Sequence, residues 1–197
     1  MKVGYAVRVL RLSLSAALFV SAVPAMAQMS GSMSEGAKQT VMVGGAAMYP
    51  SRNIIQNAIN SKDHTTLVAA VKAAGLVKTL EGPGPFTVFA PTNEAFAALP
   101  AGTVTNLLKP ENKATLTKIL TYHVVPGRLD AKLLDAKIAA GGGRVKLKTV
   151  EGDSLTVSGS GTHLKVADDK GNVANVTIPD VYQSNGVIMV VNKVLMP

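Results

Sequence analysis

Residues 84–96 read GPFTVFAPTNEAF and combine, within one short stretch, the signals for a turn, a strand and a helix. The segment 86–90 is aromatic and β-branched, which gives it the bulk and the β propensity of a buried central strand. Pro91 ends this strand, and Thr92 is a residue type that caps helix N-termini. A short helix carrying Phe96 is therefore predicted to follow the strand directly.

On both sides of this stretch the apolar residues have helical spacing. Before it, the spacing predicts helices over 53–59 and 63–74, the second capped by Asp63 and stopped by Gly75. After it, helices are predicted over 112–121 and 130–136, with a strand at 122–125 between them.

Beyond residue 143 the apolar residues recur with a period of two. This pattern predicts strands at 145–147, 155–157, 164–166, 173–178 and 187–191, with hairpin turns at 151–153 and 168–172. Helices in the first half and strands in the second favour an α+β fold. We expect one domain over residues 49–197.

The first 27 residues have the three parts of a Sec-type signal peptide. A basic segment precedes an apolar run over 12–23, and a small-residue cleavage pattern ends at Ala27. The run contains three serines and is shorter than the roughly 20 residues of a membrane span. We predict cleavage after Ala27, no transmembrane segment in the mature chain, and a secreted or periplasmic location. Residues 28–48, rich in Met, Ser, Gly and Ala, are predicted to form a flexible leader.

The composition of the 197-residue chain excludes several classes of site and partner. The chain has 20 Lys and Arg, 12 Asp and Glu and no cysteine. The lack of cysteine excludes disulfides, thiolate metal sites and thiol nucleophiles. The formal charge of +8 falls when the signal peptide and its three basic residues are removed. A mildly basic, exported chain with 4% aromatic residues is not expected to bind nucleic acid.

Three blocks, in this order, resemble the fasciclin-domain family. The first is 84–96, the second is 119–125 with its Tyr122-His123 pair, and the third runs from Asn185 to Pro197. The resemblance covers roughly 49–197 and is similar to small secreted bacterial members with a single domain. It implies a fasciclin-like wedge or sandwich of β-strands with a group of helices packed on it. It also implies a role in adhesion, with the Tyr-His pair serving mainly the integrity of the fold.

His123 is the residue that invites a catalytic or metal-binding interpretation. The three histidines are scattered and show no metal-binding spacing, and a lone histidine lacks the partners that catalysis requires. The other interpretation is a buried ring that bonds a backbone group at a helix-to-strand junction. We therefore expect no enzyme activity, no cofactor and no metal; a hydrolase using His123 is the alternative. Because the surroundings of the pair contribute to adhesion in animal members, Tyr122 and His123 are candidate partner-binding residues.

Pro179-Asp180-Val181 is a second candidate partner-binding segment. It is similar in place and type to the Pro-Asp-Ile segment that animal fasciclin proteins present to integrins, with Val181 in place of Ile. The alternative is that Asp180 caps a turn.

A basic face is predicted at residues 144–148. Arg144, Lys146 and Lys148 alternate with apolar residues, so a strand would project all three to one side. Such a face could contact acidic polysaccharide or anionic lipid. The alternative is a solvated face on which Lys prevents edge pairing.

These features together predict a secreted, non-enzymatic fasciclin-domain protein that mediates cell adhesion or association with a surface or matrix. Its partner would be a cell-surface or matrix protein or a polysaccharide. The alternative is an extracytoplasmic carrier of a small or lipidic ligand, which would need an apolar concavity with convergent polar groups. A homodimer is compatible with either function, since two-fold pairs are the commonest assembly.

Overall fold

The computed structural model describes residues 39–197, so the predicted signal peptide and the first part of the predicted leader lie outside the described residues. Helices are α1 Ile54–Ala58, α2 Thr65–Ala74, α3 Val77–Glu81, α4 Asn93–Ala97, α5 Thr103–Leu107, α6 Lys113–Tyr122 and α7 Ala131–Ala140. Strands are β1 Val41–Val43, β2 Ala46–Met48, β3 Phe86–Pro91, β4 Val124–Pro126, β5 Arg144–Lys148, β6 Ser154–Ser158, β7 Lys165–Ala167, β8 Val173–Gln183 and β9 Gly186–Val191. Two short 3₁₀ turns precede α2 and α6.

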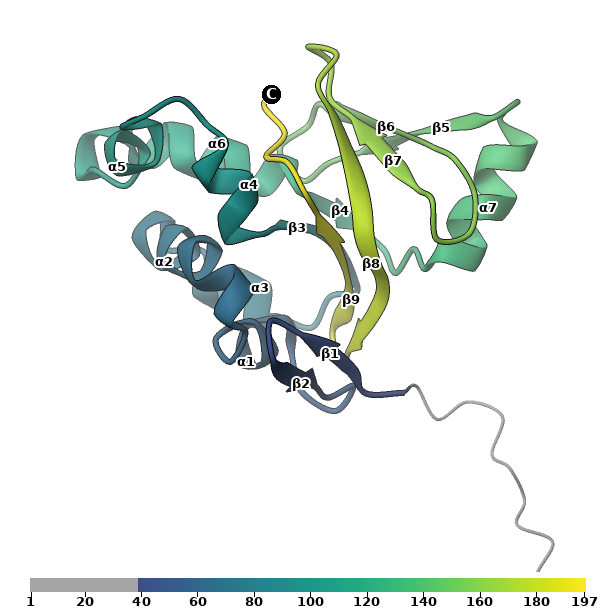
Figure 1. The fold of residues 1–197 in the computed structure, drawn as a ribbon, viewed down its shortest axis with the longest axis horizontal. Coiled ribbons are helices and arrows are strands. Elements are labelled where there is room, and N and C mark those ends of the chain that lie inside the picture. Colours follow the sequence, from purple (N-terminus) through teal and green to yellow (C-terminus); the bar gives the residue numbers. More distant parts are fainter. Residues whose placement is uncertain (1–38) are drawn as a thin grey trace, which may run out of the picture. The chain divides into compact units, whose positions relative to one another are not determined.

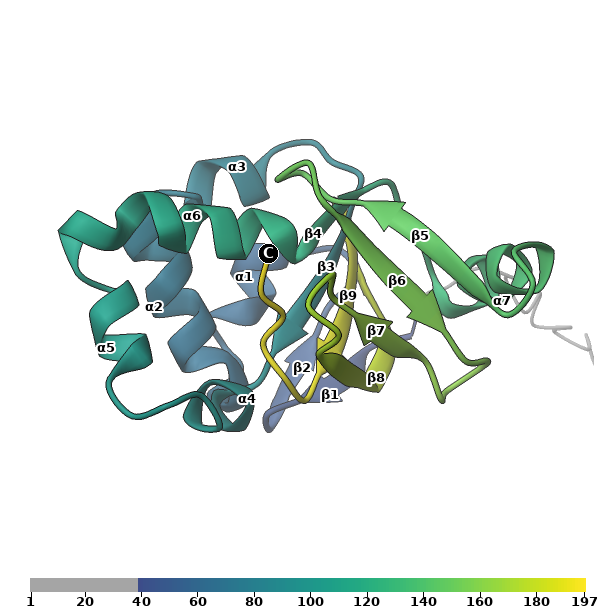
Figure 2. The same cartoon turned by 90° about the horizontal axis from the view of Figure 1, so that it is seen from above.

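Seven strands form one bent sheet in the order β4-β3-β9-β8-β7-β6-β5. All neighbouring pairs are antiparallel except β3 and β9, which run parallel, with Phe86 opposite Gly186. After β5 the chain returns to the other end of the sheet, where the backbone N–H of Val150 donates to the carbonyl of Val124 over 2.8 Å. The sheet therefore comes close to closing on itself as a wedge. Helices α1–α6 lie on one side of it, and α7 lies apart from them beside β5 (Figures 1 and 2).

The central strands β3 and β9 are buried on both faces, as the apolar stretch at 86–90 predicts. Side chains of one parity, such as Val88 and Ile188, pack with the helices in one hydrophobic cluster. Those of the other parity, such as Phe89 and Met189, pack with β5–β7 and α7 in a second cluster. The α+β prediction is confirmed, and the two strands join the helical and the sheet halves of the domain.

The strand-to-helix prediction from residues 84–96 is also confirmed. The Thr92 hydroxyl accepts a hydrogen bond from the backbone N–H of Ala95 and caps α4. The prediction that Asp63 caps the second helix is wrong. The backbone N–H of Thr66 donates instead to Oδ1 of Asn93, the first residue of α4, over 3.0 Å. Gly75 ends α2 in the left-handed conformation, as predicted.

The predicted flexible leader is corrected at its end, because β1 and β2 form a hairpin that packs on the domain. Val43 and Met48 are each only 3% exposed and belong to the helical core. The amide of Asn57 holds the end of the hairpin through the backbone N–H and carbonyl of Tyr49, and it also donates to the buried amide of Gln183. The packed fold therefore begins before residue 49, although the sequence of this segment offers few large side chains.

Candidate functional site

His123 lies where α6 meets β4, and both of its ring nitrogens contact backbone groups. Nδ1 is 2.8 Å from the carbonyl oxygen of Ile119, and Nε2 is 3.1 Å from the backbone nitrogen of Leu195. A carbonyl only accepts and an N–H only donates, so the proton must sit on Nδ1 and the ring is neutral. Burial lowers the pKa of His123, against smaller opposing effects of Ile119 and Asp168. The ring therefore joins α6 to the closing block of the sequence.

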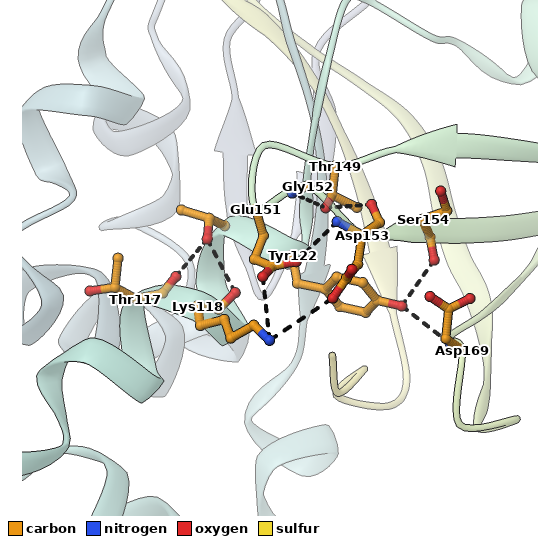
Figure 3. Close-up of polar contacts among 10 residues, drawn as sticks. Thr117, Lys118, Tyr122, Thr149, Glu151, Gly152, Asp153, Ser154 and Asp169 are labelled. Atoms are coloured by element: carbon orange, nitrogen blue, oxygen red, sulfur yellow. Dashed lines mark hydrogen bonds and ion pairs between the residues drawn. The ribbon is translucent and has the colours of Figure 1, made fainter.

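Tyr122 makes the second connection from the end of α6, as Figure 3 shows. Its hydroxyl donates to the carbonyl of Ser154 over 3.0 Å and accepts from the backbone N–H of Asp169 over 3.3 Å. Burial raises the pKa of Tyr122 to about 12. One turn earlier, Lys118 lies between Glu151 and Asp153, with its Nζ 3.4 Å and 3.9 Å from their carboxylates. The last two turns of α6 are thus attached to the β5–β6 and β7–β8 turns.

These contacts correct the prediction that Tyr122 and His123 form a partner-binding surface. Their side chains are 0% and 2% exposed, respectively, so neither can reach a partner in this structure. The alternative of a hydrolase also loses its base, because neither ring nitrogen of His123 is free to exchange a proton with a substrate. The interpretation as a buried junction residue is the one that the geometry supports.

Asp180 lies in an irregular part of β8, where the register with β9 shifts between Ile178 and Val181. Its φ of +57° makes it the only non-glycine residue with positive φ among the described residues. Its Oδ1 accepts from the backbone N–H of Ala131 over 2.7 Å, at the first turn of α7. Burial raises the pKa of Asp180, and the Ala131 N–H opposes this rise. Asp180 therefore caps a distant helix rather than its own turn.

The three residues of the predicted Pro179–Val181 segment have different environments. Pro179 and Asp180 are half-buried, whereas Val181 is 1% exposed and packs in the helical core. Val181 is therefore removed from the candidate partner-binding residues.

Three half-buried residues that the sequence did not single out lie along the second half of β8 or contact it. Asp130, the N-cap of α7, accepts from the hydroxyl of Tyr182 over 3.2 Å. Arg128 donates from Nη2 to the carbonyls of residues 183 and 184. We call Arg128, Asp130, Pro179, Asp180 and Tyr182 the Asp180 surface. No spacing in the sequence links 128–130 with 179–182, so only the tertiary structure could find it.

The basic face has the alternation that the sequence predicts. Arg144, Lys146 and Lys148 are exposed on β5, while Val145 is half-buried and Leu147 is buried. Within the described residues β5 is an outer strand of the sheet and pairs with β6, and the three cations lie opposite the serines and the threonine of that strand. The result is a row of cations beside hydroxyl groups, which ends at Lys148 opposite Ser154, the residue whose carbonyl accepts from the Tyr122 hydroxyl.

A cavity of about 70 Å³ lies between the helices and the face of β3 and β9 that they cover. Aliphatic side chains such as Leu67, Val71 and Ile188 form its walls. His64 also lines it; the side chain is 3% exposed, and Nδ1 lies 2.9 Å from the hydroxyl of Ser61. The sequence predicted neither this cavity nor a role for His64, since both depend on how helices and sheet pack.

Residues 39–197 offer neither a metal-binding cluster nor a membrane-spanning helix. No group of three or more His, Cys, Asp or Glu side chains there could hold a metal ion. No helix in that part of the chain is long and apolar enough to cross a membrane.

A group of helices packed on a bent, nearly closed sheet, with a buried Tyr-His pair at the end of α6, defines a mixed α+β domain. The chain belongs to the fasciclin domain family, whose family model matches residues 62–197.

Relatives and a solved structure agree with this assignment. The chain is 46% identical over 175 residues to Protein sll1483 of Synechocystis sp., covering 88% of this chain and 86% of that protein. It is 35% identical over 160 residues to the cell surface glycolipoprotein MPB83 of Mycobacterium bovis, covering 79% and 64%. A FAS1 domain pair from the insect cell adhesion molecule Fasciclin I has a similar fold, with a TM-score of 0.64, 19% identity and coverage of 74% of this chain. This chain spans 51% of that domain pair.

Proposed function

We propose that this protein is exported and mediates cell adhesion or attachment to a surface or matrix without catalysis. The proposal includes cleavage of a signal peptide after Ala27 and a secreted or periplasmic location. It is supported by a cell-surface relative and by a fold shared with a cell adhesion molecule. The occupied nitrogens of His123 also support it, because they remove the best candidate for a catalytic base.

The Asp180 surface carries this proposal. Backbone held in the left-handed region by a non-glycine residue is typical of sites where the surrounding structure imposes a functional geometry. Oδ1 of Asp180 is bonded to the backbone N–H of Ala131, whereas Oδ2 makes no hydrogen bond within the described residues. A carboxylate oxygen that is not bonded within the domain can accept a hydrogen bond from a polar protein or glycan group. Each contact can be weak, because many copies on a surface add avidity.

Beads coated with the mature protein test this proposal in a cell- or matrix-attachment assay. Asp180→Asn removes the charge, tolerates the left-handed backbone and keeps an oxygen for the Ala131 N–H. We expect Asp180→Asn to lower attachment several-fold. The control Asp153→Asn, in the turn between β5 and β6, should leave attachment unchanged. Equal attachment by the wild type and an inert protein would refute the adhesion function. Equal attachment by Asp180→Asn and the wild type would show that the Asp180 surface does not take part in adhesion.

The basic face supports a glycan as one class of partner. Three cations on one side of a strand are spaced about 7 Å apart, and an acidic polysaccharide can follow such a row. Replacing Arg144, Lys146 and Lys148 with Gln should weaken retention on an acidic polysaccharide column and reduce the dependence of binding on salt. Exposed Lys72, Lys78 and Lys109, replaced with Gln in the same number, provide the matched control.

A second candidate function is a carrier of a small or lipidic ligand, and the cavity is the observation that favours it. Ligand sites are mostly apolar with few polar groups, which describes the lining around His64. Mass spectrometry of protein purified natively should then detect an apolar small molecule at a defined ratio. Its absence from protein isolated from the native envelope would count against the carrier function.

A further inference from the structure

We propose that the outer face of strands β5–β8 binds an acidic polysaccharide, and that the polysaccharide chain crosses the strands between Arg144 and Lys165. The inference rests on the proposed adhesion function. It names the chemistry of one partner and the path of that partner over the domain. The basic face on β5 then forms one edge of a larger site.

The pairing of the strands brings distant residues together in one row. Arg144 of β5 pairs with Ser158 of β6, which pairs in turn with Lys165 of β7. Lys165 pairs with Asn175 of β8. Directly opposed residues of antiparallel strands project to the same side of a sheet, so these four side chains cross the sheet on one face.

The opposite face of the same strands is the hydrophobic core. The neighbouring row across the sheet is buried or half-buried and consists of Val145, Val157, Val166 and Ala174. The buried side chains of α7, such as Leu134 and Ile138, belong to this core as well. In Figure 2, α7 lies beside β5 at the edge of these strands rather than across them. The face that carries Arg144 and Lys165 is therefore the one open to a partner.

The paired positions of the outer face include four cations and no carboxylate. These positions are Arg144, Lys146, Lys148, Ser154, Thr156, Ser158, Lys165, Ala167, Val173 and Asn175. All four cations are exposed, and none forms an ion pair within the described residues. Because no acidic group of the domain pairs with them, they can attract a polyanion from solution.

Carboxylates near the two ends of β6 are bonded to other groups. Before β6, Nζ of Lys118 lies 3.4 Å from the carboxylate of Glu151 and 3.9 Å from that of Asp153. After β6, the carboxylate of Asp135 accepts from the backbone N–H of Gly161 over 2.9 Å. These carboxylates therefore do not pair with the cations of the outer face.

The groups between the cations favour a sugar polymer over a lipid surface. Neighbouring strands are about 4.8 Å apart, so Arg144 and Lys165 are about 10 Å apart, with the Ser158 hydroxyl between them. The serine and threonine hydroxyls of β6 make no hydrogen bond within the described residues and can bond to sugar hydroxyls. A chain that alternates acidic groups with hydroxylated rings fits this row. A membrane surface would favour large apolar side chains that insert, and among these positions only Val173 is a large exposed hydrophobic residue.

Lys165 provides the test, because it lies two strands away from the basic face. The probes are heparin and polygalacturonate, with uncharged dextran as the control, at about 0.15 M salt, where charges more than about 8 Å apart are largely screened. We expect Lys165→Gln and Arg144→Gln each to weaken binding about two- to five-fold, as for one exposed ion pair. The double variant should weaken binding by about the product of the two.

Two further variants separate a site from net charge. Lys72→Gln removes the same charge from an exposed position on α2 and should leave binding unchanged. Lys165→Arg keeps the charge and should bind as the wild type does. Because Lys165 is exposed, both of its variants should keep the circular dichroism spectrum of the wild type.

Several results would overturn the inference. If the three substitutions on β5 weaken binding but Lys165→Gln does not, the basic face acts alone and the site across the strands is wrong. An equal loss in Lys72→Gln would show that net charge is responsible. Equal binding of dextran, no binding of either acidic polymer, or binding only to vesicles that contain phosphatidylglycerol would also overturn it.

The adhesion function can fail separately. Attachment that is lost in Asp180→Asn would still support adhesion if neither acidic polymer binds. If Lys165→Gln weakens binding of an acidic polymer as expected but the wild type attaches no better than an inert protein, the polysaccharide site stands and the adhesion function is wrong.

Discussion

Asn185 provides the sharpest test of how the helices are attached to the sheet. The side chain is 6% exposed and lies in the turn between β8 and β9. Its Oδ1 accepts from the backbone N–H of Ile54 over 3.0 Å. Its Nδ2 donates to the carbonyls of Leu80 and Gly82 over 2.7 Å and 2.9 Å. One amide thus satisfies groups at the start of α1 and the end of α3, and Asn185→Ala would leave all three without this partner.

The expected cost follows from these three bonds. At about 1 kcal/mol for each net hydrogen bond, Asn185→Ala should lower the free energy of unfolding by about 3 kcal/mol. That is a large share of the roughly 5–15 kcal/mol of a typical domain. Asn192→Ala is the matched control: its exposed side chain accepts one bond from the backbone N–H of Asn175, so it should cost about 1 kcal/mol.

Guanidinium unfolding followed by circular dichroism measures both costs, provided that the slopes stay equal. The pH dependence of the stability of Asn185→Asp is a second test. Its carboxylate would face two carbonyl oxygens, which repel the charged form, so the protonated form should be the more stable one. Its stability should therefore rise relative to Asn185→Ala as the pH falls. If Asn185→Ala costs no more than Asn192→Ala, the reasoning that this amide joins the two halves is wrong.

Three further predictions use the same measurement. Burial lowers the pKa of His64 and His123 in the folded state below 6.5, so below that pH the unfolded chain binds these two protons more readily than the folded chain does. The free energy of unfolding should therefore fall as the pH drops from about 6.5, by up to about 1.4 kcal/mol per pH unit for each histidine. A flat stability profile between pH 5 and 7 would contradict their burial. Gly44→Ala should be strongly destabilising because its Cβ would lie 2.4 Å from a side-chain oxygen and 2.6 Å from a backbone nitrogen, whereas Gly45→Ala, also at positive φ, meets no atom within 4 Å and should cost only about 1 kcal/mol. Asp180→Ala should cost roughly 2 kcal/mol, from the lost helix cap and the left-handed backbone, and Asp180→Gly about half of that; equal costs would show that backbone strain plays no part.

The sequence predicts the parts of the fold that are encoded locally. Residues 84–96 contain their own strand, stop and cap, and the structure reproduces each as β3, Pro91 and Thr92. The alternation at 144–148 correctly places three cations outside and Leu147 inside. In both cases neighbouring residues carry the whole signal, so no tertiary information is needed.

The missed features depend on contacts between distant segments. The β1–β2 hairpin is rich in Gly, Ala and Met, yet Val43 and Met48 are buried because helices already provide a surface for them. Asn93 caps α2 from another helix, a partner that no local pattern identifies. The Tyr122-His123 pair is recognisable as a motif, and a buried His123 that bonds a backbone group is one of its interpretations. The partner of Nε2, the backbone N–H of Leu195, could not be predicted because it comes from a distant segment.

The parallel pairing of β3 with β9 has a consequence for the order of folding. β3, which lies between the two hydrophobic clusters, cannot pair with β9 until residues 186–191 are available. The backbone N–H of Leu195 must then also reach Nε2 of His123. Closing so long a loop costs chain entropy before any contact compensates it, which slows folding. A nascent chain of this kind remains incompletely folded until almost all of it has been synthesised. For a protein that we propose to be exported, that delay lengthens the time during which the chain can still be moved as an unfolded polymer.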